Sequence, residues 1–430
     1  MREMSIERTK APETKDFQLF ELTSPRKFML RNGIEETLFY NAQLELIHFV
    51  VVLHTGILHE PQKHLSSMCF ALMKGAVQGK TAEEVNDFLD YYGVSLEVEQ
   101  GMTTTEINIS VPLRNCESVL PFVIHLLLYP LFEEDALERQ KQLNIKRLEY
   151  NMGKGSYRAT QLMFKTLFGE NTCRGTQLTR QHIEALTASQ LEEYYHHVLV
   201  SRNVSLYVSG QVDESLQQLI ETTFSQIPEG SVSLLAAKML EGNVSPWVYE
   251  EDADSMQSSM TLCRRFVGYN HPDNRAWPVL SVLFGGYFGS RLMQNLRETN
   301  GYTYGVFNGT MFFLDQSIHY IDSEVNIDKT DLAVKACYDE MRRLQEEKPG
   351  DEELTLVRNY MLGSVLREVD GSIKLMKRYI YWQNFGLDER EFYQNIEAIR
   401  TTDADTIQRL AQTYLQPETF TTIVVGKSSR

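Results

Sequence analysis

The order of predicted helices and strands occurs twice along the chain, and this diffuse internal repeat constrains the fold more than any single motif does. In each half, a helix that ends at a glycine leads into two successive strands, and two helices follow. The predicted ranges of the first half are 82–92, 94–99, 106–111, 117–128 and 134–151. Those of the second half are 291–299, 302–310, 318–326, 331–346 and 351–368. Two equivalent α+β domains are the simplest explanation of this order.

The ends of the two halves agree as well. Ile183-Glu-Ala-Leu-Thr precedes a predicted helix and strand, and Ile396-Glu-Ala-Ile-Arg precedes a similar pair. We therefore expect each domain to be a mainly antiparallel sheet with helices packed on one face. The pattern loosens around Pro-Glu-Gly-Ser and Gly-Asn-Val-Ser-Pro. The predicted division is 1–230 for the first domain, 231–250 for a linker and 251–430 for the second domain.

The composition indicates a globular protein with an acidic surface. The 430 residues are 42% hydrophobic, which is ample for real cores. A net charge of -16 argues against nucleic acid or an anionic membrane as the main partner, and it favours a cationic or unfolded peptide. The five cysteines include no Cys-x-x-Cys pair, which favours a reducing compartment. The chain start lacks an apolar signal segment and no apolar run reaches 18 residues, so we expect a cytoplasmic protein.

The segment from Gly289 to Gly305 carries the clearest candidate site. A predicted helix ends at Asn300-Gly301 and runs directly into a strand, which puts Arg297 in the last helical turn and Tyr304 at the start of the strand. A guanidinium and a phenol held on two rigid elements could both donate hydrogen bonds to a peptide carbonyl from one side. The alternative is purely structural: a cation favoured by the helix dipole and a half-buried strand aromatic.

The same segment resembles the insulinase/pitrilysin family of zinc metallopeptidases. Members often read Ser-Arg-Leu-x-x-x-Leu-Arg-Glu-x-x-Gly-x-x-Tyr in their second domain, and residues 290–304 match this pattern. The resemblance covers nearly the whole chain and implies two similar α+β domains arranged as half of a clamshell. It also implies that Arg297 and Tyr304 bind the substrate.

The zinc motif of that family is degenerate here. Active members carry His-x-x-Glu-His on a helix of the first domain, where two histidines bind zinc and the glutamate activates water. The segments Leu72-Met-Lys-Gly-Ala76 and Lys80-Thr-Ala-Glu-Glu-Val85 resemble family landmarks downstream of this motif. Counting back from the first landmark places the motif positions at Ser66, Cys69 and Phe70.

These residues could not form the family's zinc site. The third ligand position falls near Arg147, and a single thiolate beside an arginine does not make a three-ligand site. We therefore expect the chain to bind no metal or other cofactor. Cys69 could act as a nucleophile, but its apolar neighbours favour a buried structural thiol.

Two other features were weighed as ligand sites. His54, His59, Glu60 and His64 lie close together, but their spacing misses both zinc motifs and Pro61 interrupts a helix, so loop histidines are favoured. The glycines between 285 and 289 could suggest a phosphate loop, but no Lys-Ser/Thr follows. A helix break with close packing is the better interpretation.

By the family resemblance, the chain is the non-catalytic subunit of a heterodimeric zinc metallopeptidase. A paralogous partner would supply the zinc, and Arg297 and Tyr304 would hold a peptide that adds to a sheet edge. The alternative is a structural or scaffolding homologue with no part in peptide cleavage, although a scaffold has no need of both residues. A third possibility is a homodimeric peptide-binding protein that needs no zinc-bearing partner.

Overall fold

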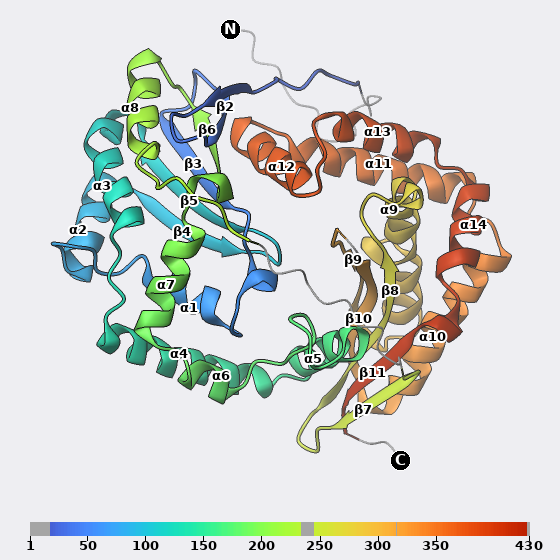
Figure 1. Cartoon of the computed structure of the whole chain (residues 1–430). Coiled ribbons are helices and arrows are strands. Elements are labelled where there is room, and N and C mark those ends of the chain that lie inside the picture. Colours follow the sequence, from blue (N-terminus) through green and yellow to red (C-terminus); the bar gives the residue numbers. More distant parts are fainter. Residues whose placement is uncertain (1–17, 234–244, 315, 428–430) are drawn as a thin grey trace, which may run out of the picture.

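The computed structural model describes residues 18–233, 245–314 and 316–427, which form two halves side by side (Figure 1). Each half contains one sheet and a layer of helices on one face of that sheet. Almost all strand pairs are antiparallel, so the fold is the predicted α+β class. Within the described ranges, every helix is too short or too polar to cross a lipid bilayer.

The first sheet has six strands in the order β1-β2-β6-β3-β5-β4, and only β2 and β6 pair in parallel. Its strands are β1 (Arg26–Met29), β2 (Glu35–Tyr40), β3 (Leu46–Leu53), β4 (Ser95–Gln100), β5 (Thr105–Pro112) and β6 (Val204–Gly210). The helices of this half are α1 (Leu65–Leu72), α2 (Ala82–Tyr92), α3 (Cys116–Leu128), α4 (Glu134–Met152), α5 (Gly155–Phe168), α6 (Arg180–Glu184), α7 (Ala188–Val198) and α8 (Glu214–Phe224).

The second sheet has five strands in the order β7-β11-β8-β10-β9, and only β7 and β11 pair in parallel. Its strands are β7 (Trp247–Glu251), β8 (Gln257–Val267), β9 (Thr303–Met311), β10 (Gln316–Asn326) and β11 (Thr421–Gly426). The helices are α9 (Trp277–Ser281), α10 (Thr330–Glu346), α11 (Asp351–Glu368), α12 (Ser372–Asn384), α13 (Arg390–Thr401), α14 (Ala404–Tyr414) and the π-helices η5 (Val282–Gly286) and η6 (Met293–Thr299).

Short 3₁₀ turns connect these elements: η1 (Ile57–His59), η2 (Leu113–Asn115), η3 (Ser201–Asn203), η4 (Pro272–Arg275), η7 (Ile327–Lys329) and η8 (Pro417–Thr419). The strand order is the same in both sheets when β2, β6, β3, β5 and β4 are matched to β7, β11, β8, β10 and β9, with β1 as an extra edge strand. The internal repeat seen in the sequence is therefore a repeat of sheet topology.

Two helices cross from one half to the other. Helix α5 comes from the first half but packs its buried residues, such as Met163 and Leu167, against Cys263 and Ile423 of the second sheet. Helix α12 comes from the second half and packs against β2 and β6 of the first sheet. Figure 1 shows both helices between the halves. Each sheet thus has its own helices on one face and a helix of the other half on the opposite face.

Local sequence signals explain which elements were predictable. The bounds predicted for α2 and α11 agree with the structure, because each helix has a clear start, such as the Thr81 capping box of α2. The elements that were not predicted include the strands β1, β2, β3, β7 and β8 and the helices α5, α8, α9 and α12. The range 291–299 was predicted as an α-helix, but from Met293 onward it is the π-helix η6.

Candidate functional site

Arg297 and Tyr304 lie on either side of a tight junction between η6 and β9. Gly301 adopts a left-handed conformation with φ of 62° at this junction, as the Asn300-Gly301 pair predicted. The Asn300 N–H donates to the Asn295 carbonyl at 3.1 Å, which is the wide bonding pattern of a π-helix. Such turns are frequent at functional sites.

Arg297 is held by an aromatic ring and a carboxylate. Its guanidinium lies 4.8 Å from the centre of the Phe288 ring, and its Nε is 3.4 Å from Glu298 Oε1. Its side chain remains 38% exposed. Phe288 is itself 60% exposed, so the contact between its ring and the guanidinium lies on the surface. The guanidinium therefore has a preferred position but keeps donors free for a ligand.

Tyr304 extends into solvent at the start of β9. The residue is 88% exposed, and within the described ranges no hydrogen bond joins it to Arg297. A β-bulge interrupts the pairing of β9 with β10 at this point, between Ser323 and Val325. Bulges redirect side chains, which explains how a strand residue becomes so exposed. Both side chains are thus exposed, and they are not joined to each other.

The backbone behind this site is closely packed. A Cβ on Gly285 of η5 would lie 2.5 Å from Asn308 Cβ of β9, so η5 and β9 can approach only because this residue is glycine. Asn308 in turn donates to the Ser281 carbonyl at 2.9 Å. The glycine-rich segment is therefore a site of close packing, as the sequence indicated. Arg291 fixes the start of the following helix by a bidentate ion pair with Glu353, with both distances at 2.8 Å.

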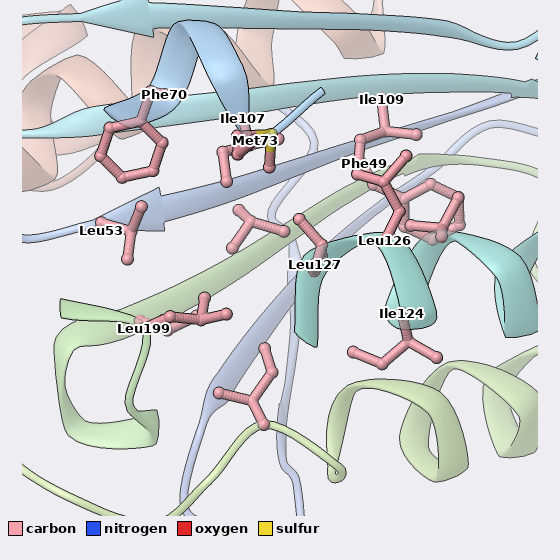
Figure 2. Close-up of a cluster of buried hydrophobic side chains, with 14 of the residues drawn as sticks. Phe49, Leu53, Phe70, Met73, Ile107, Ile109, Ile124, Leu126, Leu127 and Leu199 are labelled. Carbon is pink, nitrogen blue, oxygen red and sulfur yellow. The ribbon is translucent and has the colours of Figure 1, made fainter. Parts of the chain in front are cut away.

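The three degenerate zinc-motif positions lie in the interior of the first half. Ser66 and Cys69 are 0% exposed, and Phe70 is 1% exposed. Figure 2 shows the Phe70 ring in the hydrophobic cluster that also contains Leu53 and Ile107. All three positions are therefore part of the packed core of the domain.

The contacts of these residues are structural. Ser66 Oγ accepts a hydrogen bond from Gln100 at 2.5 Å, and the Cys69 thiol donates to the Leu191 carbonyl at 3.5 Å. Burial raises the pKa of Cys69 well above its usual range, so the residue stays a neutral thiol. This chemistry suits neither a metal ligand nor a nucleophile.

Two polar residues, Glu60 and Asn144, stabilise the start of α1. The buried Glu60 accepts hydrogen bonds from the backbone N–H groups of His64 and Ser66, at 3.0 and 3.2 Å. Asn144 of α4 faces this helix and lies 3.0 Å from His64 Nε2. Burial lowers the pKa of His64 to about 4, so its ring is neutral near pH 7. Arg147, predicted near the third ligand position, is exposed.

The residues present do not fit a zinc ion. Within the described part of the chain, no three His, Cys, Asp or Glu side chains are grouped as metal ligands. The histidines of the 54–64 segment have separate partners: His54 lies 2.9 Å from Ser205 Oγ, and His59 Nδ1 accepts from the Gly56 N–H. A metal site built on Ser66, Cys69 and Phe70 would also have to displace a closely packed core.

Sequence reasoning did not identify Phe288 as a partner of Arg297. The residue lies nine positions before Arg297 in a glycine-rich stretch, and no short motif relates the two. No sequence signal would have found it, because the exposure of Phe288 and its contact with Arg297 are properties of the folded structure. Glu60 was noticed, but as part of a histidine cluster and not as the anchor of α1.

Comparisons with known proteins identify chains that are similar to this one. Residues 185–361 match the family described as Peptidase M16 inactive domain. An uncharacterized zinc protease of Rickettsia felis is 22% identical over 300 residues, which are 67% of this chain and 69% of the relative. The probable inactive metalloprotease YmfF of Bacillus subtilis is 22% identical over 225 residues, which are 51% of this chain and 52% of YmfF.

Solved structures share the fold over nearly the whole chain. A peptidase M16 inactive domain from Pseudomonas fluorescens superposes with a TM-score of 0.85 at 16% identity, covering 94% of this chain and 99% of that one. The periplasmic protease PqqL from Escherichia coli superposes with a TM-score of 0.79 at 14% identity, covering 98% of this chain but 49% of PqqL. Residues 185–361 therefore carry a domain of the Peptidase M16 inactive type, and the chain as a whole is similar to proteins described as zinc proteases or inactive metalloproteases.

Proposed function

We propose that the chain is the non-catalytic subunit of a two-subunit zinc metallopeptidase. In this proposal a paralogous subunit supplies the zinc site, and Arg297 and Tyr304 bind the peptide. The observation that carries the proposal is a contrast between the two halves. The zinc-motif positions Ser66, Cys69 and Phe70 are buried in the core, whereas Arg297 and Tyr304 stand exposed on rigid elements.

The contribution of this chain follows from the chemistry of the two exposed groups. The Arg297 guanidinium can donate to a peptide carbonyl, and the Tyr304 hydroxyl can donate to the same or a neighbouring carbonyl. Both would offset negative charge that develops on the carbonyl oxygen during attack by the partner's site. The Phe288 ring reduces the number of positions open to Arg297, which lowers the entropy lost on binding.

The relatives support a division into two units. PqqL is described as a periplasmic protease, and this chain covers about half of its length. A second subunit would supply the corresponding other half here. The Rickettsia relative is described as a zinc protease and YmfF as a probable inactive metalloprotease, so names of both kinds occur among similar chains.

The test is hydrolysis of a quenched fluorescent peptide by this chain alone, by the zinc-motif paralogue from the same source alone, and by the mixture. Zinc is present throughout, and a chelator arm shows that the turnover needs metal. We expect hydrolysis in the mixture at a rate well above that of either chain alone. Hydrolysis by this chain alone would overturn the proposal.

Two further outcomes would also reject it. If the two chains co-purify but the mixture has no activity on any of several unrelated peptides, the chain is a scaffold. If the native mass of this chain from its own source corresponds to a homodimer without a paralogue, it is a solitary peptide-binding protein.

A further inference from the structure

Helix α10 carries a carboxylate at a position where the helical pattern favours an apolar residue. The buried face of α10 includes Val334, Cys337, Met341 and Leu344, and Glu340 lies on this same face. Glu340 is 7% exposed. A carboxylate is rarely buried to this degree unless it is paired, because the protein interior solvates a charge poorly. The contacts of Glu340 must therefore supply the reason for its presence.

Pairing with a cation does not supply this reason. Arg343 Nη1 is 3.8 Å from Glu340 Oε1, but Arg343 Nε makes a closer ion pair with Glu347, at 2.9 Å. In the described part of the chain, Glu340 Oε2 is buried and has no hydrogen-bond partner. Replacing a buried and weakly paired charge by an apolar side chain is often neutral or stabilising. The stability of the fold therefore does not account for Glu340.

A chain of hydrogen bonds connects Glu340 with the candidate site. Asn295 of η6 donates through its Nδ2 to Glu340 Oε1 at 3.0 Å. On its other side, Asn295 Oδ1 accepts from Asn300 Nδ2 at 2.7 Å. The Asn295 carbonyl also accepts from the N–H and from Nδ2 of Asn300, at 3.1 and 2.9 Å. The turn 295–300 is thus closed by Asn300 and bonded to α10 through Glu340, and Arg297 lies in the middle of this turn.

The carboxylate gives this chain of hydrogen bonds a single direction. An ionised carboxylate accepts and does not donate, so the Asn295 side chain must turn its NH2 group toward Glu340. The amide oxygen of Asn295 then faces Asn300, which can donate to it. If the Asn295 amide were flipped, its NH2 group would face that of Asn300, and the bonds on both sides would be lost. A carboxylate at position 340 therefore favours one arrangement of the turn.

We propose that Glu340, acting through Asn295, is a positioning residue that holds the turn 295–300 in the arrangement in which Arg297 donates to the peptide. This inference rests on the proposed function, because it explains how Arg297 is held for that role. The turn fixes the backbone of Arg297, and the Phe288 ring limits the rest of the side chain. A donor that is already in place needs no rearrangement when charge develops on the peptide carbonyl.

The test compares Glu340→Gln with Glu340→Leu, because both variants remove the same charge. Glutamine keeps an oxygen that can accept from Asn295 in one of its two orientations, and leucine has no acceptor. Hydrogen exchange of the isolated full chain, measured by mass spectrometry, reports opening of the turn. The N–H groups of residues 300–302 bond to the carbonyls of residues 295–297. We expect their exchange to be about 10-fold faster in Glu340→Leu and about 3-fold faster in Glu340→Gln.

Turnover by the two-subunit complex distinguishes positioning from a structural role. Glu340→Leu should lower kcat about 10-fold with KM nearly unchanged, because Arg297 acts on charge that develops in the transition state. Glu340→Gln should recover most of this loss. The free energy of unfolding in urea should not fall in Glu340→Leu. An equal loss of kcat in both variants, or a loss of kcat that accompanies a loss of stability, would overturn the proposal.

Two further variants serve as controls. Glu347→Gln removes the closer ion pair of Arg343 but no bond to Asn295, so exchange and kcat should stay at the level of the parent. Asn295→Ala breaks the chain of hydrogen bonds at its centre. Adding Glu340→Leu to Asn295→Ala should therefore cause no further change, because both substitutions act on one connection. Additive effects of the two substitutions would show that Glu340 does not act through Asn295.

Hydrogen exchange requires neither a partner nor turnover, so it separates this inference from the proposed function. If the complex cleaves peptides and Glu340→Leu changes neither exchange nor kcat, the subunit assignment holds and the positioning role is wrong. If exchange responds as expected but no paralogue gives cleavage, the connection between Glu340 and the turn is confirmed. The proposed function, and with it the positioning of Arg297 for a peptide, is then rejected.

Discussion

At the scale of single residues, the Arg297 guanidinium contacts one aromatic ring, that of Phe288, and one carboxylate, that of Glu298. The Phe288 ring holds the guanidinium from one side, while Glu298 can be exchanged for a ligand because the ion pair is long and partly exposed. An exposed ion pair of this kind contributes at most about 1 kcal/mol. A peptide carbonyl could therefore accept a hydrogen bond from the guanidinium in place of Glu298, with only a small loss of free energy.

We expect Arg297→Ala to lower the turnover of the two-subunit complex by about 10²-fold, because one donor to the developing charge is removed. Tyr304→Phe should also lower the turnover, because it removes the hydroxyl that would donate to the peptide carbonyl. The measurement is the rate of peptide hydrolysis at a saturating concentration of the partner subunit. Arg202→Ala, at an exposed arginine of the first half, is the matched control and should retain full turnover. Unchanged turnover in both site variants would refute the peptide-binding role.

A second residue-scale prediction concerns Glu36, which is fully buried on β2. Burial raises its pKa to about 7, although Gln217 donates a hydrogen bond to it at 2.6 Å. The folded state therefore holds this proton more tightly than the unfolded state does. The free energy of unfolding should fall as the pH rises from about 4.5 to 7, because in that range the unfolded chain has lost this proton while the folded chain still holds it.

Glu36→Gln should remove this loss of stability at higher pH, because the amide has no proton to lose. At pH 8 we expect the variant to be more stable than the parent by roughly 2–3 kcal/mol, and at pH 4.5 the two should be nearly equal. Urea unfolding at the two pH values measures the difference. Glu35→Gln, which breaks only an exposed ion pair with Lys27, should change the stability slightly at both. A destabilised Glu36→Gln variant at pH 8 would show that the carboxylate is well stabilised where it is.

At the scale of elements, two glycines determine how the helices near the site meet β9. Gly301 needs a left-handed backbone, yet a Cβ there would meet no atom within 4 Å. Gly285 has the opposite requirement: a Cβ there would lie 2.5 Å from Asn308 Cβ and 2.9 Å from Leu292 Cδ1. The first glycine relieves backbone strain, and the second provides space between η5 and β9.

The two positions should therefore respond differently to substitution. Gly301→Ala should cost about 1 kcal/mol of unfolding free energy, and Gly301→Asn should cost less because asparagine tolerates the left-handed region. Gly285→Ala should cost about 1–3 kcal/mol, because β9 must move. Urea unfolding checks both. If Gly301→Asn were as destabilising as Gly301→Ala, or if Gly285→Ala were neutral, this assignment of roles would be wrong.

The sequence predicted the parts of the site that depend on local chemistry. The Asn300-Gly301 stop and the positions of Arg297 and Tyr304 followed from helix-end and strand signals, and the structure confirms them. The π-helical turn was not predictable, because a single extra residue per turn leaves no clear mark on a short apolar pattern. The stacking of Phe288 on Arg297 depends on the path of the chain between η5 and η6, and sequence spacing does not contain that information.

At the scale of the whole molecule, the repeat predicted the topology but not the exchange of helices. The periodicity within 155–168 or 372–384 shows that a helix has an apolar face, but not which sheet this face covers. Helix α12 brings Tyr379 to 5.5 Å from Phe39 of the first sheet, and its Ser372 hydroxyl lies 2.8 Å from Ser209 Oγ. The two halves are therefore joined by buried contacts as well as by the chain between them.

This exchange predicts that the halves depend on each other for folding. Without α12, residues 1–240 would expose Phe39, Val50, Val52 and Tyr207, which belong to the same buried cluster as Tyr379. Each fully buried side chain of this kind contributes about 1.5–3 kcal/mol, and an exposed patch of four promotes aggregation. We expect this fragment alone to be insoluble or molten, and co-expression with residues 241–430 to restore a soluble complex.

Tyr379→Ala in the full chain should weaken the same contact and lower the unfolding free energy by about 3–5 kcal/mol. Size-exclusion chromatography and calorimetry measure these outcomes. If residues 1–240 formed a stable monomer with a sharp unfolding transition, the first half would fold independently and the crossing helices would serve only to orient the two sheets.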